Sequence, residues 1–206
     1  GALLPHRWRQ TVLLVTPILG GLSLLGLEGD TVLRLDLMGL VLEPLRVDRL
    51  SLLFGYLFHI AAFIGVVFSL HLRDRLQHVA ALLYAGSALG AVFAGDLVTL
   101  FLFWEMLALT SAFLIFARRT ERAYRAGIRY LVIQVISGVL LLAGALMLYR
   151  QTGSLAFNHI GLTGFASGLI FVAFGIKCAF PLLHNWLTDG YPEATVTGTV
   201  FLSAFT

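Results

Sequence analysis

Two ionisable residues, Glu105 and Lys177, lie deep inside long apolar segments of the sequence. Glu105 falls about eight residues into the apolar run from Leu97 to Ala117, roughly 12 Å along a helix and close to the middle of a bilayer. A charge at that depth costs about 2.5 to 3.5 kcal/mol on insertion scales, so such residues are usually kept for function. A carboxylate and an amine that are both sheltered from water can hold and release protons. The two residues therefore indicate proton transfer within a membrane.

Lys177 is the only lysine, whereas thirteen arginines occupy the other basic positions. Arginine stays charged in proteins, but lysine can lose its proton when it is buried. A lysine at the one deep basic position therefore favours titration. The alternative is structural, because a lysine near a helix end can extend its ammonium group to the membrane surface. The corresponding alternative for Glu105 is a protonated or paired carboxyl group that only holds helices together.

Three further residues are candidates for the same site. Pro181 follows Lys177 by four residues, so it removes a backbone donor, clashes with the carbonyl of residue 177 and predicts a helix break beside the lysine. Broken helices at membrane depth are typical of transporters, although this proline also fits an ordinary helix end. His59 lies inside another apolar run, where it either packs as a hydrogen-bonded residue or joins a proton relay. His184, in the loop after Pro181, is a second candidate for that relay.

The composition shows what kind of fold must position these residues. Hydrophobic residues make up 59% of the 206 residues and charged residues only 12%, against about a quarter in soluble domains. So few charges exclude a water-soluble globule, and the apolar content excludes a disordered chain. The net charge of +3 reflects loop orientation and does not indicate nucleic-acid binding. The sequence predicts one all-α membrane domain over residues 1–206, embedded in a lipid bilayer.

Hydropathy predicts six membrane spans and the beginning of a seventh. The spans are approximately Thr11 to Leu27, Ser51 to Leu70, Val79 to Gly95, Leu97 to Ala117, Tyr130 to Tyr149 and Gly161 to Pro181, and the seventh begins near Ala194. A full span needs about 20 residues, and the seventh apolar stretch is shorter than this. The chain also begins with glycine and not with methionine. We therefore expect a fragment that is truncated at both ends.

The loop charges predict the orientation of the spans. Residues 118–129 hold five arginines and one glutamate, a net charge of +4, whereas residues 28–50 hold five acids and three arginines, a net charge of −2. Cytoplasmic loops are enriched in arginine and lysine, so the basic loops are expected on the cytoplasmic side of a bacterial inner membrane. Within 28–50, leucines at 33, 35 and 37 alternate with Arg34 and Asp36, Met38-Gly39 can turn, and residues 40–42 can return. This pattern predicts a short β-hairpin on the outer face.

No cofactor or metal site is expected. Cys178 is the only cysteine, and no set of cysteines and histidines has the spacing of a zinc site. Haem ligation needs paired histidines at one depth, and the histidines other than His59 in the body of the chain fall in loops. The sequence also contains no nucleotide-binding loop or serine-hydrolase motif.

Several segments together resemble the antiporter-like, proton-translocating membrane subunits of respiratory complex I. Gly95-Asp96-Leu97, followed by Phe103-Trp104-Glu105 and Leu109-Thr110-Ser111, resembles the fifth-helix region of that family. Gly175-Ile176-Lys177 and the run from Phe180 to Ala194 resemble its seventh-helix lysine and the loop that follows. The segment Val47 to Ser51 also fits, whereas Thr188 and Thr195-Val196-Thr197 depart from positions where many members have proline. The superfamily includes antiporter-like subunits of Mrp-type sodium/proton antiporters and the membrane subunits of energy-converting hydrogenases.

The resemblance implies a protein of about fourteen helices built as two inverted five-helix units, of which this chain would hold the second helix to the start of the eighth. Glu105 and Lys177 would be the family's charge pair in the first half-channel, and at about 4 Å such a pair is worth roughly 4 kcal/mol. The implied partners are other membrane subunits, and the implied ions are protons or sodium. The implied function is proton translocation in a complex I-like NADH:quinone oxidoreductase, without a redox centre in this chain. A sodium/proton antiporter subunit, a hydrogenase subunit and a structural scaffold are the alternatives.

Overall fold

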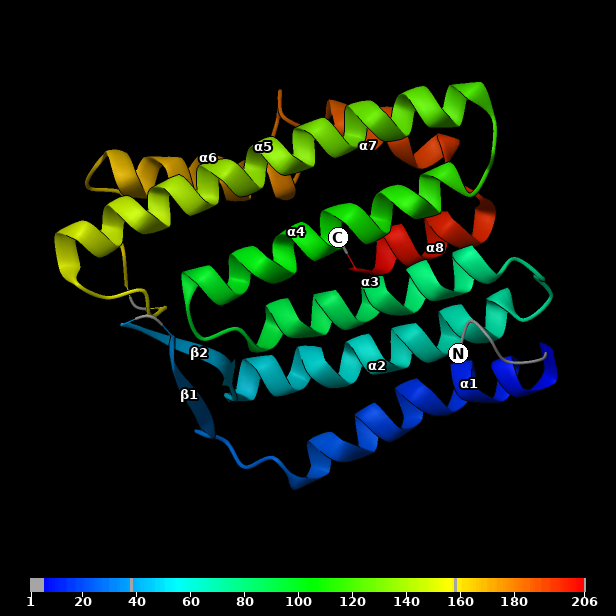
Figure 1. Cartoon of the computed structure of the whole chain (residues 1–206), viewed down its shortest axis with the longest axis horizontal. Coiled ribbons are helices and arrows are strands. Elements are labelled where there is room, and N and C mark those ends of the chain that lie inside the picture. Colours follow the sequence, from blue (N-terminus) through cyan, green and yellow to red (C-terminus); the bar gives the residue numbers. More distant parts are fainter. Residues whose placement is uncertain (1–5, 38, 158, 206) are drawn as a thin grey trace.

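The computed structural model describes residues 6–37, 39–157 and 159–205, which form a bundle of antiparallel helices with a small sheet at one end (Figure 1). The longer helices are α1 (His6–Ser23), α2 (Arg49–Ser69), α3 (Arg75–Phe93), α4 (Leu97–Phe116) and α5 (Glu121–Thr152). Shorter elements are η1 (Leu24–Gly26), β1 (Val32–Leu37), β2 (Leu40–Arg46), α6 (Phe165–Lys177), α7 (Asn185–Gly190), η2 (Tyr191–Glu193) and α8 (Val196–Phe205).

Helices α1 to α5 are each long and apolar enough to cross a membrane. Large apolar side chains cover their outward faces: on α2, for example, Ile60 is 56% exposed and Ile64 is 58% exposed. Such faces suit lipid, and the closed hydrogen bonding of a helix satisfies the backbone there. The prediction of an all-α integral membrane protein is confirmed.

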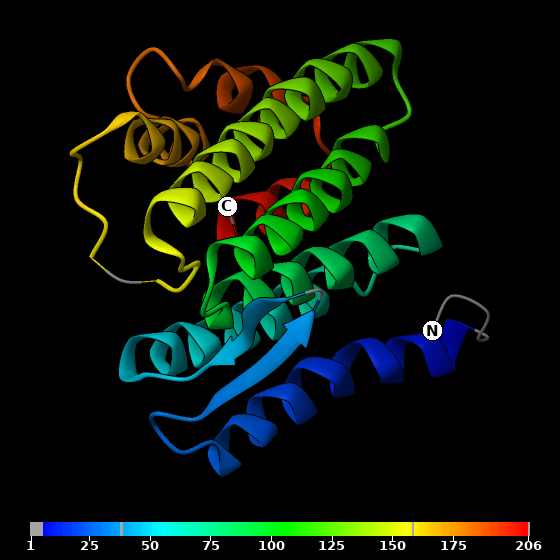
Figure 2. The same ribbon diagram turned by 60° about the vertical axis from the view of Figure 1, so that its left-hand side comes forward.

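Successive helices run in opposite directions, and α4, α5 and α6 lie next to one another (Figure 2). The loop between α2 and α3 meets the loop between α4 and α5, because Arg119 Nη2 lies 2.9 Å from Asp74 Oδ2. Two of the predicted basic loops therefore lie together at one end of the bundle. The hairpin lies at the opposite end (Figure 1).

Helix α5 begins nine residues before the predicted span, at Glu121 and not at Tyr130. Thr120 caps it by accepting a hydrogen bond from the Ala123 amide at 3.1 Å, and Glu121 adds a negative charge to the first turn. The arginines that limited the predicted span are good helix formers, so they do not limit the helix. Its 32 residues extend about 48 Å, which exceeds the roughly 30 Å of hydrocarbon, so α5 projects beyond the membrane.

The sixth predicted span is shorter in the structure than hydropathy indicated. Helix α6 has 13 residues, or about 20 Å, and ends at Lys177. An irregular segment, 178–184, follows before α7 begins at Asn185. The apolar residues from Phe180 to Leu183 continue the hydropathy signal across this segment, so hydropathy does not detect the end of the helix. The fold therefore contains the discontinuous helix that the sequence predicted.

The predicted hairpin is confirmed, since β1 and β2 pair antiparallel with Leu37 opposite Leu40. The register shifts between Leu33 and Leu35, which indicates a β-bulge. Gly39 adopts φ +81°, a left-handed conformation that favours glycine in the turn. Met38, the other predicted turn residue, lies outside the described residues.

Asp96 joins the hairpin to the start of α4 and is fully buried. Its Oδ1 accepts hydrogen bonds from the amides of Val98 at 2.9 Å and Thr99 at 2.8 Å, which caps the helix. Its Oδ2 accepts hydrogen bonds from the Thr99 hydroxyl at 2.6 Å and from the Glu43 amide on β2 at 2.7 Å. One carboxylate thus fixes the axial position of α4 relative to the sheet.

Two apolar cores hold the bundle together. The first includes Tyr84, Leu114 and Phe201, and lies where α3, α4 and α8 meet. The second includes Leu97, Leu141 and Ala173, and joins α4, α5 and α6. The second core matters for function because it brings the helices that carry Glu105 and Lys177 against the same helix, α5.

Candidate functional site

Lys177 lies at the last residue of α6, and its side chain points into the bundle and not to the membrane surface. Its Nζ donates a hydrogen bond to Gln134 Oε1 on α5 at 3.0 Å. The same Nζ lies 5.3 Å from the centre of the Trp104 ring on α4, within the range of a cation–π contact. Both partners are buried, so the lysine is held inside the protein by two neighbouring helices.

Glu105 lies on α4 and packs against α5. A methyl group added at Gly138 would overlap its Oε1, so the glycine leaves the space that the carboxyl group occupies. Glu105 Oε1 is buried and has no hydrogen-bond partner among the described residues. The carboxyl group is therefore sheltered without being used to satisfy a neighbouring donor.

The described residues form no ion pair between Glu105 and Lys177, although the two charges lie close enough to interact through space. The direct contact that the sequence predicted at about 4 Å is replaced by the contact of Lys177 with Gln134. Gln134 and Gly138 are one turn apart on α5, so the two charged groups meet neighbouring positions of the same helix face. The Nε2 of Gln134 is also buried and lacks a partner within the described chain.

Trp104 is held in a fixed orientation beside the lysine. Its Nε1 donates to Ser137 Oγ at 2.9 Å, and Ser137 in turn donates to the Gln134 carbonyl at 2.6 Å. Phe174 packs edge-on against the indole at 5.1 Å between ring centres. We call Trp104, Glu105, Gln134, Ser137 and Lys177 the polar cluster.

The backbone leaves the helical conformation directly after Lys177. Ala179 and Leu182 adopt φ +53° and +72°, and Pro181 lies between them. Trp186 on α7 is buried and donates from Nε1 to the Ile176 carbonyl at 2.9 Å, which satisfies one of the free carbonyls at the end of α6. The chain interruption is therefore built around the lysine and closed by a tryptophan.

An open pocket of about 320 Å³ reaches Lys177 from the side of α7 and α8. Its lining includes Cys178, Trp186, Tyr191 and Ser203. Irregular backbone inside a membrane protein is tolerated where it lines such a cavity. The pocket gives the lysine a route to small molecules or ions that the buried Gln134 contact does not block.

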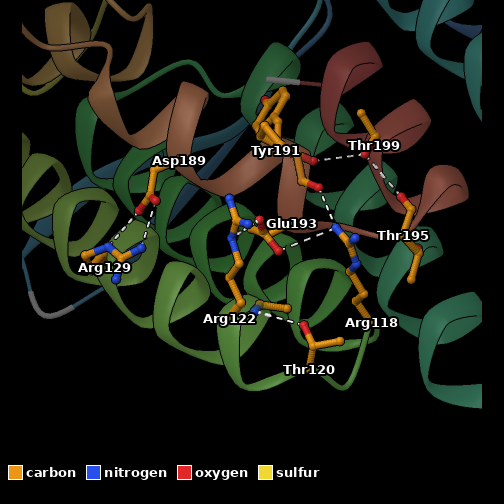
Figure 3. Close-up of polar contacts among 11 residues, drawn as sticks. Arg118, Thr120, Arg122, Arg129, Asp189, Tyr191, Glu193, Thr195 and Thr199 are labelled. Atoms are coloured by element: carbon orange, nitrogen blue, oxygen red, sulfur yellow. Dashed lines mark hydrogen bonds and ion pairs between the residues drawn. The ribbon is translucent and has the colours of Figure 1, made fainter.

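The segment after the break is anchored to α5 by charged residues (Figure 3). Arg129 forms a two-point contact with Asp189, with both nitrogen–oxygen distances at 2.7 Å. Glu193 is 7% exposed and accepts from Arg122 Nε at 2.6 Å, and Arg118 Nη1 lies 3.5 Å from it. The basic residues of the predicted cytoplasmic loop therefore position α7 and η2.

The hydrogen bonds from Arg129 hold the pKa of the Asp189 carboxyl group below its usual value, and the charge of Arg129 acts in the same direction. A carboxylate with a lowered pKa remains ionised at neutral pH, so this contact persists through the physiological range. The stability that it contributes is present above the unfolded pKa, and is lost as the pH falls through the lowered folded value.

The structure does not bring His59 or His184 to the polar cluster. His59 lies on α2, where its Nδ1 contacts the Gly55 carbonyl at 2.7 Å and its ring packs against Gly20 of α1. This arrangement matches the alternative in which His59 is a hydrogen-bonded packing residue. His184 is exposed in the irregular segment before α7, close in sequence to Lys177 but on the surface.

Sequence reasoning missed Gln134. Glutamine carries no charge, so it did not stand out among the ionisable residues of the spans. A signal was nevertheless present, because Gln134 is the only carboxamide in the apolar run from Tyr130 to Tyr149. Its position one turn before Gly138 could have identified the face of α5 that meets the charged residues.

Replacing Gly138 by alanine is expected to impair any proton transfer that depends on Glu105. The added methyl group would occupy the space of the Glu105 carboxyl group, which must then move. A displacement of about 1 Å at a reacting group costs on the order of a hundredfold in rate. Proton transport by the assembled full-length protein in membrane vesicles measures the effect.

Gly86→Ala on α3 is the matched control, because an added methyl group there meets nothing within 4 Å. We expect this variant to assemble and transport normally. Unchanged transport in the Gly138→Ala variant would show that the close packing of Glu105 against α5 is not required.

Comparison with known proteins identifies similar chains. Residues 94–206 match the family model described as NADH:quinone oxidoreductase/Mrp antiporter, TM. NADH-quinone oxidoreductase subunit N 2 of Roseiflexus castenholzii is 31% identical over 206 residues, covering 87% of this chain and 41% of that protein. Among solved structures, respiratory complex I from Thermus thermophilus gives a TM-score of 0.79 at 24% identity over 98% of this chain and 47% of the other. The Mrp complex from Dietzia sp. gives 0.82 at 20% identity over 96% and 41%.

The chain spans less than half the length of each of these relatives. The two structural matches show a shared helical architecture, including the interrupted helix and the neighbouring long helices. The family match covers α4 to α8, which contain every residue of the polar cluster.

Proposed function

Because this chain belongs to the NADH:quinone oxidoreductase/Mrp antiporter transmembrane family, we propose that it forms part of a proton-translocating membrane subunit of a complex I-like NADH:quinone oxidoreductase. Residues 1–206 act as one membrane domain of that subunit, beside other membrane subunits in a bacterial inner membrane. The observation that supports this most directly is the burial of Lys177 beside Glu105, at the point where α6 is interrupted. The relative from Roseiflexus castenholzii, a subunit N, supports the choice of complex.

In the proposed mechanism, Lys177 holds a proton and Glu105 controls how strongly it is held. When the carboxylate approaches the ammonium group, attraction between them retains the proton on the lysine. When the two groups separate, the buried ammonium loses that attraction and passes its proton onward. Because the groups interact, they titrate as a coupled pair.

Glu105→Gln tests this mechanism. The substitution keeps the size of the side chain but removes the titratable carboxyl group. We expect proton transport in the full-length complex to fall by about a hundredfold, which is typical when a positioned proton-transfer group is lost. The measurement is acidification of inverted membrane vesicles driven by NADH, together with native gel electrophoresis to follow assembly.

Glu121→Gln is the matched control. Glu121 lies in the exposed first turn of α5, where it pairs only with Arg125 at 2.8 Å, so its loss should leave transport unchanged. If Glu105→Gln transports protons normally in an assembled complex, the proposed mechanism is wrong. Failure of Glu105→Gln to assemble, with normal transport by the residual complex, supports the structural scaffold instead.

Sodium/proton exchange is the second candidate, since the fold of the Mrp complex matches this chain with a TM-score of 0.82. The same vesicles separate the two functions. Acidification that requires NADH and is independent of sodium supports the oxidoreductase. Proton movement that is driven by a sodium gradient without NADH supports an antiporter.

A further inference from the structure

We propose that Gln134 is a positioning residue that competes with Glu105 for the Lys177 ammonium group. This inference rests on the proposed function and adds the partner that holds the lysine when it is separated from the carboxylate. In the structure the ammonium lies 3.0 Å from the Gln134 amide oxygen, and it makes no ion pair with Glu105 among the described residues.

The geometry sets the orientation of the amide. A lysine ammonium group only donates hydrogen bonds, so the Gln134 oxygen must face it. The amide nitrogen then faces another direction, where it is buried and has no partner within the described chain. A donor and the unpartnered Glu105 Oε1 acceptor are thus supplied by adjacent turns of the α4–α5 contact.

Burial makes this arrangement costly unless it is used. Gln134 is fully buried, and an unpaired amide donor in the interior costs about 1 to 3 kcal/mol in general. An apolar residue at position 134 would avoid that cost and would leave Lys177 free to contact Glu105 directly. The glutamine instead supplies a neutral acceptor, which binds the ammonium group less strongly than a carboxylate does.

Two positions for the lysine follow from this competition. On Gln134, the ammonium is held by a neutral group and gives up its proton more readily. On Glu105, it is held by a full negative charge and retains the proton. The titratable groups that face the ammonium are Glu105 on α4 and Cys178 at the end of α6, so the exchange between partners decides how readily the proton leaves.

The test compares the pH dependence of NADH-driven proton transport in vesicles that contain the full complex. Gln134→Met removes the amide at nearly constant size, and Gln134→Glu replaces it with a carboxylate. In both variants the ammonium group faces only negatively charged acceptors, so release of the proton needs a higher pH. We expect the pH–rate profile to move upward by about one unit with Gln134→Met, and further with Gln134→Glu.

Gln77→Met is the matched control, because Gln77 is also a buried amide, 5% exposed, but it donates to Thr195 at 2.7 Å and to Thr197, away from Lys177. We expect it to affect stability without moving the pH–rate profile. An unmoved profile in both Gln134 variants, or an equal movement with Gln77→Met, overturns the role of Gln134. If Gln134→Met does not assemble, the profile of Gln134→Glu decides the question.

Lys177→Met separates this inference from the function on which it rests. Loss of transport in Lys177→Met, combined with an unmoved profile in the Gln134 variants, contradicts only the positioning role. Normal transport in Lys177→Met contradicts the proposed function, and the role of Gln134 with it.

Discussion

Replacing Lys177 by methionine is expected to reduce proton transport to the background rate, a loss of about a hundredfold or more. Methionine has a similar length but cannot carry a proton. The substitution also removes the cation from the Trp104 ring and leaves Gln134 Oε1 without its donor. The structural cost is that of one unsatisfied buried acceptor, about 1 to 3 kcal/mol, so the complex should still assemble. Vesicle acidification, normalised to assembled complex, measures the loss.

Lys177→Arg distinguishes a positive charge from a titratable one. Arginine keeps the charge beside Trp104 but does not release its proton in proteins. We therefore expect Lys177→Arg to assemble and to transport as poorly as Lys177→Met. Arg150→Met, at the exposed end of α5, serves as the control for loss of a basic residue. Substantial transport in Lys177→Arg would show that the charge, and not proton release, is what the site needs.

Replacing Asp96 by alanine is expected to cause the largest loss of stability among single changes near the hairpin. The carboxylate accepts four hydrogen bonds, three of them from backbone amides, and is fully buried. Alanine leaves these donors unsatisfied in the interior, so we expect a destabilisation of about 3 to 5 kcal/mol. Thermal unfolding of the purified protein in detergent, followed by circular dichroism at one fixed heating rate, measures the change.

Asp74→Ala is the appropriate comparison, because Asp74 also caps a helix. It accepts only one backbone hydrogen bond, from Leu76 at 3.0 Å, and it pairs with the exposed Arg119. Loss of a single cap costs about 1 kcal/mol, so the thermal midpoint should fall much less than with Asp96→Ala. Equal midpoints for the two variants would show that the link between the hairpin and α4 contributes little.

The sequence alone identified the membrane fold, the hairpin and the two deep charges for simple physical reasons. Apolar runs of sufficient length report directly on membrane spans, and alternation in residues 32–37 reports directly on a strand. Glu105 and Lys177 stood out because charge inside an apolar run is rare. These signals are local, so a single sequence carries them.

What the sequence did not supply is how separate helices meet. Gln134 could not be recognised as the direct partner of Lys177, because the two residues are 43 positions apart and the contact depends on how α5 packs against α6. The end of α6 at Lys177 was suggested by Pro181 but was hidden from hydropathy by the apolar residues that follow. The early start of α5 was missed because charge was taken to mark a loop, whereas arginine-rich segments form helices readily.

The contact between Trp104 and Lys177 has a practical consequence, because it gives the protein a built-in optical reporter. The excited state of an indole ring is more polar than its ground state, so its emission colour depends on nearby charge. The ammonium lies 5.3 Å from the ring centre, whereas the other described tryptophans, Trp8 and Trp186, have no such cation beside them. When the lysine gives up its proton, that field disappears and the fluorescence of Trp104 changes colour. The charge state of the proposed proton carrier is thus visible in the light that the protein itself emits.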